Sequence, residues 1–172
     1  MPYSKLLPLK KASKVKKPPK ILSKGELTKK AYKKLENELD GLWSQIIHER
    51  WGHKCGWPGC TYKTLRLSSH HWIHRAAGYK ARWNLDNGIL LDYFHHIHSV
   101  HQMGNTEPIR DALIERLGQD GFDKLKKDCT GVWKPTIDEL EELRYMFRGE
   151  LSKKLETDLA GAVQDMRMRG AL

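Results

Sequence analysis

The run SHHWIHRAAGYKARWNLDNGILLDYFHHIHSVH, residues 69–101, holds seven of the nine histidines of the chain. Such clustering is difficult to explain by packing alone. Neutral imidazole binds divalent metals and, because its pKa lies near neutrality, it can also take a proton from water. Hydrolysis of a phosphodiester needs both abilities at one phosphate, since a metal offsets negative charge while a base generates hydroxide. The run therefore predicts a metal-dependent hydrolytic site.

The order and spacing within this run resemble the HNH motif of ββα-metal (His-Me finger) endonucleases. The matching pieces are Ser69-His70-His71-Trp72-Ile73, then Asn87-Gly88-Ile89-Leu90-Leu91, then His95-His96. The resemblance implies an α+β fold in which flanking α-helices surround a small ββα-metal core. It also implies a divalent-metal-dependent endodeoxyribonuclease.

The resemblance gives each matching position a role. His70 and His96 would bind one catalytic Mg²⁺ or Mn²⁺, His71 would act as the general base, and Asn87 would hold His71 in position. Asn84 is the weaker match for the central asparagine. Because neighbouring strand residues point to opposite sides, we expect a bend or irregular backbone at His70-His71.

Three further histidines have no firm role in the sequence. His98 or His101 could complete the coordination of the catalytic metal, contact a phosphate, or do neither. His74 is not assigned by the motif and has no role in the prediction.

A second metal site is expected next to the first. There are only three cysteines, Cys55, Cys60 and Cys129, and this odd number argues against a disulfide framework. Many HNH proteins hold a structural Zn²⁺ with two C-x2-C pairs, which Cys55-x4-Cys60 and Asp92-x2-His95 replace here. We expect zinc bound by Cys55, Cys60, His95 and Asp92. Asp92 could instead cap a helix, which would leave His98 as the fourth ligand.

The positive charge of the chain is concentrated at its start. The net charge is +10, and residues 1–34 contain twelve Lys and a single acidic residue, Glu26. Residues 1–25 combine lysines and prolines without a sustained apolar period, which predicts a disordered arm. Such an arm suits a polyanion such as DNA, although it could also be a solvated tail.

Basic side chains of two regions are candidate contacts to DNA. In the arm they are Lys10, Lys11, Lys16 and Lys17; in the run of histidines they are Arg75, Lys80 and Arg82. The last three could grip phosphates beside the site or simply be solvated.

Apolar spacing divides the rest of the chain into helices. We expect one over 26–50 with Ser23 as its cap, a hairpin within 51–87 around a loop near Gly78, and a helix from about Asp92. Further helices are predicted over 107–117, 120–129 and from Thr136, which forms a capping-box pattern with Glu139. The domains are then the arm 1–25, the nuclease core with its preceding helix 26–105, and a helical region 106–172.

The C-terminal part resembles the lambdoid phage recombination proteins NinG or Rap. The residues are Leu113-Ile114-Glu115-Arg116-Leu117-Gly118-Gln119 and Trp133-Lys134-Pro135-Thr136-Ile137-Asp138-Glu139-Leu140. The resemblance implies a phage or prophage protein that acts on branched recombination intermediates such as Holliday junctions or D-loops. Without a membrane span or a secretory signal, we expect it in the host cytoplasm.

Other functions fit parts of the same pattern. One is a phage homing or packaging-associated HNH nuclease on duplex DNA, and another is a non-catalytic, zinc-stabilised DNA-binding module. An RNA-directed nuclease or a protein–protein adaptor is a further alternative. The apolar stripe from Ile137 to Leu155 is typical of core, but its length also allows a homodimer.

Overall fold

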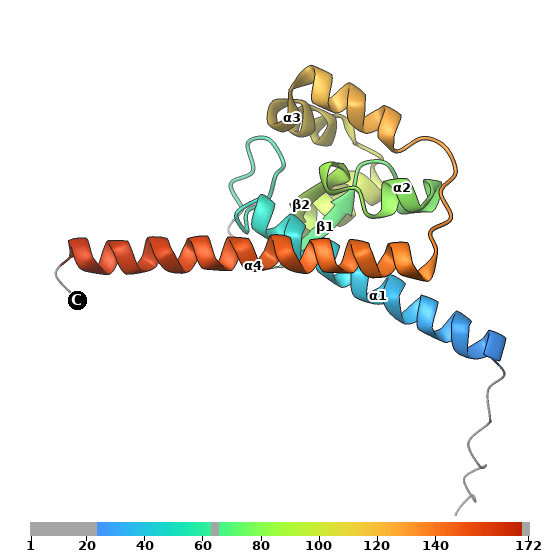
Figure 1. Cartoon of the computed structure of the whole chain (residues 1–172). Helices are drawn as coiled ribbons and strands as arrows, with labels where there is room; N and C mark the ends of the chain where they lie inside the picture. Colours follow the sequence, from blue (N-terminus) through green and yellow to red (C-terminus); the bar gives the residue numbers. More distant parts are fainter. Residues whose placement is uncertain (1–23, 63–65, 170–172) are drawn as a thin grey trace, which may run out of the picture.

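The computed structural model describes residues 24–62 and 66–169, which form a mostly helical fold around one small antiparallel sheet (Figure 1). Helix α1 covers Lys24–Arg50, and the strands are β1, Leu67–His71, and β2, Gly88–Asp92. The connection between them holds η1 (Arg75–Ala77), α2 (Tyr79–Arg82) and η2 (Leu85–Asn87). After β2 come the π-helix η3 (Phe94–Gln102), α3 (Glu107–Asp128) and α4 (Ile137–Met168). The expected combination of helices with a small sheet is confirmed.

Strands β1 and β2 pair antiparallel, with His70 opposite Ile89 and His71 opposite Gly88. The connection between them contains Gly78, as expected, but the whole of β2 lies beyond the stretch 51–87 in which we placed the hairpin, so the position predicted for the second strand was wrong. Every residue of β2 is buried. A strand buried on both faces has a continuous apolar run instead of an alternating one. Without alternation, the sequence does not indicate at which residues the strand begins and ends.

The sheet lies between α3 on one side and the crossing helices α1 and α4 on the other (Figure 1). Ile89 and Leu91 of β2 join a core with α3, whose buried side chains are Ile109, Ala112, Leu113, Phe122 and Leu125. Leu90 joins the opposite core with α1 and α4, whose buried side chains are Leu35, Leu39, Trp43, Ile46, Ile47, Leu140 and Phe147. The core therefore continues across the expected domain boundary at residue 105.

Gly88 allows α1 to lie directly against the start of β2. A Cβ atom at this position would be 2.2 Å from Ile47 Cδ1 and 2.9 Å from Trp43 Cζ2. Trp43 Nε1 also donates a hydrogen bond of 3.0 Å to the Asn84 carbonyl. This close approach brings the middle of α1 to the edge of β1.

The C-terminal helices largely follow the prediction. The two expected helices over 107–117 and 120–129 are the two halves of α3, which changes direction at Gly118, where φ is 73°. The capping box at the start of α4 is confirmed, since Glu139 N donates to Thr136 Oγ1 at 3.2 Å and Thr136 N donates to Glu139 Oε2 at 2.6 Å.

The first half of α4 packs on α1, and its second half projects past the rest of the fold (Figure 1). The stripe proposed for dimerisation is thus partly core, and a homodimer stays a prediction. No helix among the described residues is long and apolar enough to cross a membrane. The arm with Lys10, Lys11, Lys16 and Lys17, and the Ser23 cap, lie outside the described residues.

Candidate active site and metal centres

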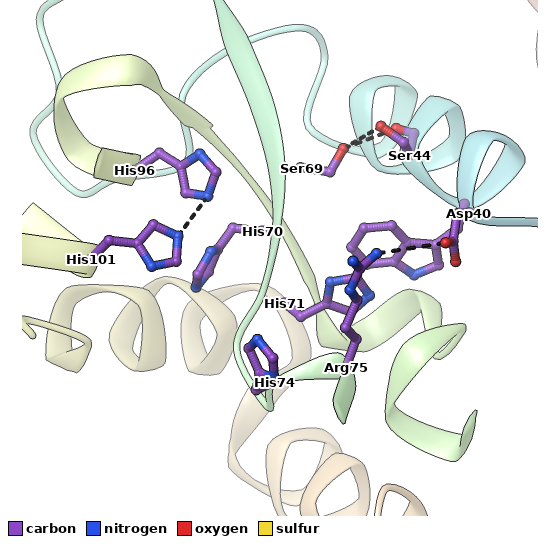
Figure 2. A pocket seen from close by; sticks show the side chains of 10 residues that line it. Asp40, Ser44, Ser69, His70, His71, His74, Arg75, His96 and His101 are labelled. Atoms are coloured by element: carbon purple, nitrogen blue, oxygen red, sulfur yellow. Dashed lines mark hydrogen bonds and ion pairs between the residues drawn. The ribbon is translucent and has the colours of Figure 1, made fainter. Parts of the chain in front are cut away.

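A pocket of about 410 Å³ opens along the free edge of β1 (Figure 2). Four segments line it, and their residues are Asp40, Trp43 and Ser44 of α1, Ser69, His70 and His71 of β1, His74 and Arg75 of the following loop, and His96 and His101 of η3. The run of histidines thus meets one face of α1 in a single cavity.

Three imidazoles converge on one side of β1 (Figure 2). The ring nitrogens of His70, His96 and His101 that could bind a metal all lie within 4.8 Å of one another, and His96 Nε2 is 3.1 Å from His101 Nε2. The expected pair His70 and His96 is therefore brought together. His101, which the sequence left open, joins it.

The chemistry of this cluster fits a divalent metal. Burial, and then the neighbouring His96 and His101, lower the pKa of His70 to about 4. Burial and His101 also lower the pKa of His96. Both rings are thus neutral at pH 7, which is the form that binds metals. Three imidazoles without a carboxylate suit a first-row transition metal better than Mg²⁺, which prefers oxygen ligands.

His71 lies on the other side of β1, against α1 (Figure 2). Its Nε2 is 2.7 Å from the Arg82 carbonyl oxygen, and its ring stacks on Trp43 with centroids 3.8 Å apart. Because a carbonyl only accepts hydrogen bonds, Nε2 carries the hydrogen, and the neutral ring keeps a lone pair on Nδ1. Burial lowers the pKa of His71, which favours this neutral form.

The bend that we expected at His70-His71 does not occur. Both residues belong to the regular strand β1 and pair with β2 in register. They point to opposite sides, and the pocket wraps around the edge of the strand to include both. An edge strand makes this possible because no other strand of the described residues pairs with its outer side.

Asn87 is fully buried and holds the loop that follows His71. Its Nδ2 donates to the carbonyls of Ile73 and Ala81 at 2.8 and 2.9 Å, and its Oδ1 accepts from Ile73 N at 2.8 Å. The amide thus fixes the backbone beside His71 and not the His71 ring itself. The side chain of Asn84 caps η2 instead.

The basic residues of the loop have different surroundings. Arg75 lines the pocket, is largely exposed, and lies 3.6 Å from the Asp40 carboxylate. Arg82 has a side chain only 15% exposed and pairs with both Asp40 and Glu36 at 2.8 Å. This buried pairing gives Arg82 a structural task in place of the expected contact to a phosphate. Lys80 is exposed but lines a different pocket, beside Trp133.

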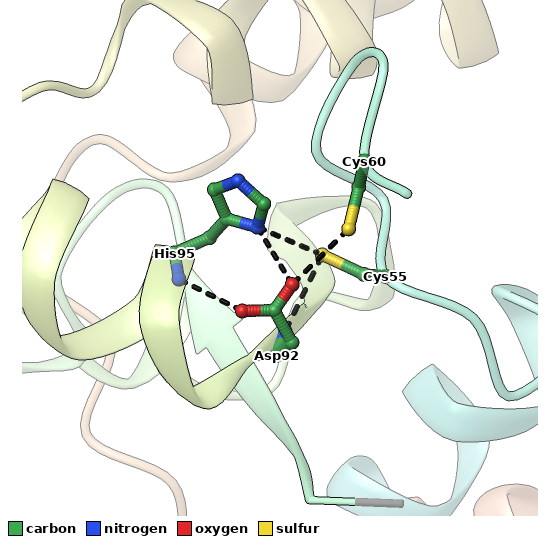
Figure 3. A group of neighbouring side chains, drawn as sticks. All are labelled: Cys55, Cys60, Asp92 and His95. Atoms are coloured by element: carbon green, nitrogen blue, oxygen red, sulfur yellow. Dashed lines mark hydrogen bonds and ion pairs between the residues drawn. The ribbon is translucent and has the colours of Figure 1, made fainter. Parts of the chain in front are cut away.

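A second cluster contains Cys55, Cys60, Asp92 and His95, whose potential ligand atoms also lie within 4.8 Å of one another (Figure 3). Asp92 Oδ2 is 2.7 Å from His95 Nδ1 and 3.1 Å from Cys60 Sγ, and Cys55 Sγ is 3.6 Å from His95 Nδ1. Two thiols, an imidazole and a carboxylate form a donor set that zinc accepts with tetrahedral geometry. The expected four residues are therefore compatible with a structural metal.

Asp92 is placed for both of the roles between which the sequence could not decide. Its Oδ1 accepts a hydrogen bond of 2.8 Å from His95 N at the start of η3, while its Oδ2 faces the two cysteines. His98, the alternative ligand, is exposed and donates from Nδ1 to Gln102 at 2.9 Å. His74 is also used locally, since its side chain accepts from Ala76 N and caps η1.

Sequence reasoning missed the part of the pocket that α1 supplies. Trp43 has the spacing of a core residue, and Asp40 and Ser44 look like ordinary polar positions of a helix. Ser44 Oγ lies 2.7 Å from Ser69 Oγ, which links α1 to β1 directly. No pattern in the sequence predicts these contacts, because they join segments about 30 residues apart through tertiary packing.

Comparison with protein families gives a match to the model described as Bacteriophage Lambda NinG protein, over residues 8–157. Comparisons with curated proteins and with solved structures give no match. The family match includes both histidine-containing clusters and reaches further toward the N-terminus than the resemblance found by reading the sequence. Since it spans most of the sequence, the chain belongs to the bacteriophage lambda NinG protein family.

Proposed function

We propose that this protein is a metal-dependent HNH endonuclease that cuts branched DNA during phage recombination. The observation that carries the proposal is the pocket at the edge of β1. It presents three converging imidazoles on one side of the strand and, on the other, His71, whose neutral ring has its lone pair on Nδ1. Membership of the NinG family supports the role in phage recombination.

The succession of elements also supports the HNH assignment. A strand that carries His70, a second strand, and a helix that carries His96 follow one another as β1, β2 and η3. This is the order that a ββα-metal core requires. The fully buried Asn87 lies between the two strands and fixes the loop beside His71.

The side chains of the pocket have different roles in hydrolysis. His70, His96 and His101 would hold the catalytic metal, which would supply positive charge to offset the negative charge of the scissile phosphate and of the departing oxygen. His71 accepts the proton of the attacking water at Nδ1, while the Arg82 carbonyl and the Trp43 ring keep the imidazole in place. In-line attack on the phosphorus then breaks its bond to the 3′ oxygen, which takes a proton from solvent water, and leaves 5′-phosphate and 3′-hydroxyl ends. Arg75 at the rim contacts a neighbouring phosphate.

The second cluster holds a structural zinc in this proposal. Cys55 and Cys60 belong to the loop that follows α1, and Asp92 and His95 lie where β2 passes into η3. A zinc ion between them would tie the loop to the first turn of the helix that carries His96. Its role is to fix the position of that helix.

A cleavage panel tests the proposed function. End-labelled Holliday junctions, D-loops, flaps and linear duplexes of matched sequence are incubated with the protein and Mn²⁺ or Mg²⁺, and His70→Ala serves as the control for contaminating nuclease. We expect cuts at branch points, with ends that DNA ligase can rejoin. DNA binding without cleavage under any divalent metal would support a non-catalytic module instead. Equal cutting of linear duplexes would support a homing or packaging-associated nuclease.

A further inference from the structure

Three exposed aromatic residues lie at the start of η3 or in contact with it. They are Tyr62, Tyr93 and Phe94, with 58%, 62% and 44% of their surfaces exposed, and we call them the aromatic patch. The rings of Tyr62 and Phe94 are in contact, with centroids 5.5 Å apart. Neighbouring exposed rings on a protein surface are typical of a binding site.

The second metal cluster anchors this patch. Tyr62 is two residues from Cys60, and Tyr93 and Phe94 lie between Asp92 and His95. The ring of Tyr62 also meets the buried His95 edge-on, with centroids 5.7 Å apart. Because Asp92 and His95 are buried, the backbone beneath the patch is held in place while the rings face solvent.

The patch and the catalytic cluster lie on different sides of one helix. Phe94 and His96 are two residues apart on η3, and side chains with this spacing do not face each other. A helix with its side chains is about 10–12 Å across. A group bound at the patch is therefore within a few nucleotides of a phosphate held at His96.

The charge of the segment that contains the patch indicates which class of molecule could bind there. Residues 51–106 contain six Lys or Arg and only two acidic residues, Asp86 and Asp92. Asp92 is buried, and Asp86 pairs with Arg50 at 3.2 Å. Arg75 and Arg82 pair with acidic residues of α1, but the segment still has an excess of positive charge. Such a segment with exposed aromatic rings fits a nucleic acid whose bases can stack on the rings. Only an unpaired base can reach them, because paired bases stay within the duplex stack.

We propose that the aromatic patch stacks an unpaired nucleobase and thereby places the branch point of the DNA next to the catalytic pocket. This inference rests on DNA being the substrate, as proposed above, but not on cleavage. It assigns the preference for branched DNA to a surface that is separate from the metal ligands.

Binding without added divalent metal tests the inference. The probes are two duplexes of the same sequence, one with an unpaired 2-aminopurine and one with the same base paired. We expect the wild type to bind the unpaired probe at least fivefold more tightly and to quench its fluorescence. The double variant Tyr62→Leu with Phe94→Leu, which keeps apolar side chains but removes the rings, should lose both effects. Tyr145→Leu, which removes an exposed ring from α4, should retain them.

The outcomes separate this inference from the proposed nuclease. Equal affinity of the wild type for both probes, or an unchanged preference in the double variant, would overturn the inference whether or not the protein cuts DNA. Loss of the preference in the double variant alone would support it, even if no cleavage were found. Circular dichroism of each variant verifies that the fold is retained.

Discussion

His96 and His101 are five residues apart on η3, yet their Nε2 atoms lie only 3.1 Å from each other. The π-helical backbone explains this, because its i→i+5 hydrogen bonding places residues five apart on the same side. In an α-helix the residues three or four apart would be neighbours instead. The convergence of these two candidate metal ligands therefore depends on the π-helical turn.

The first prediction concerns His101 as the third ligand. His101→Ala should weaken Mn²⁺ binding at least about tenfold, because even residues that only orient ligands contribute this much. His98→Ala removes an exposed histidine of the same helix and should leave Mn²⁺ affinity unchanged. Isothermal titration calorimetry measures both. Equal affinities in the two variants would exclude His101 from the site.

The second prediction concerns Asn87 as the buried link within the hairpin loop. Asn87→Ala leaves the backbone groups of Ile73 and Ala81 without their partners, and each such loss costs about 1–3 kcal/mol. We therefore expect the free energy of unfolding to fall by at least about 2 kcal/mol. Asn37→Ala, on the exposed face of α1, should change it by about 0.5 kcal/mol or less. Urea denaturation that gives similar values for both would contradict this role.

The third prediction concerns acid stability. Burial raises the pKa of Asp40, but the hydrogen bonds and the charge of Arg82 lower it by more than burial raises it. The pKa of Asp40 therefore lies below the ordinary 3.8. Burial likewise raises the pKa of Glu36, and bonds from Lys33 and Tyr79 with the charge of Arg82 bring it below 4.5. Both groups bind protons less readily when folded, so their stabilisation is present above pH 4.5 and is lost as the pH falls through the lowered values.

Unfolding in urea over a pH series measures this effect. The double variant Glu36→Gln with Asp40→Asn should be less stable than the wild type near neutrality and should lose less stability between about pH 5 and pH 3. Stability curves of the two proteins that run parallel through this range would show that Arg82 does not hold these carboxylates ionised.

The fourth prediction concerns the cysteine-containing cluster. The purified protein should contain stoichiometric zinc, and a strong chelator should lower its melting temperature because metal binding adds to folding free energy. Cys60→Ala should lose the metal, whereas Cys129→Ala, at a buried cysteine outside the cluster, should keep it. Inductively coupled plasma mass spectrometry gives the metal content. Zinc retained by Cys60→Ala would place the metal elsewhere.

The sequence could predict the elements whose signals are local. The capping box of Thr136 and Glu139 and the break of α3 at Gly118 are each specified by residues close in the chain. The two groups of candidate metal ligands were also predictable, because their residue types and spacing resemble a known motif.

Other features of the site depend on long-range packing. Trp43 stacks on His71 only because Gly88 lets α1 approach β2. The pairing of Arg82 with Glu36 and Asp40 likewise joins residues about 40 apart and changes an expected DNA contact into a structural one. The position of His101 depends on a π-helical turn, for which residue spacing gives no rule.

Cleavage of a Holliday junction by His71→Ala, compared with the wild type under saturating Mn²⁺, tests the central proposal most directly. His53→Asn is the matched control, since His53 is an exposed histidine outside the pocket and asparagine tolerates its positive φ. Loss of a general base should lower the cleavage rate by about 10²–10⁴-fold in His71→Ala, with Mn²⁺ affinity and His53→Asn activity retained. A His71→Ala rate within about threefold of the wild type would contradict the account, because that change is far smaller than a general base contributes.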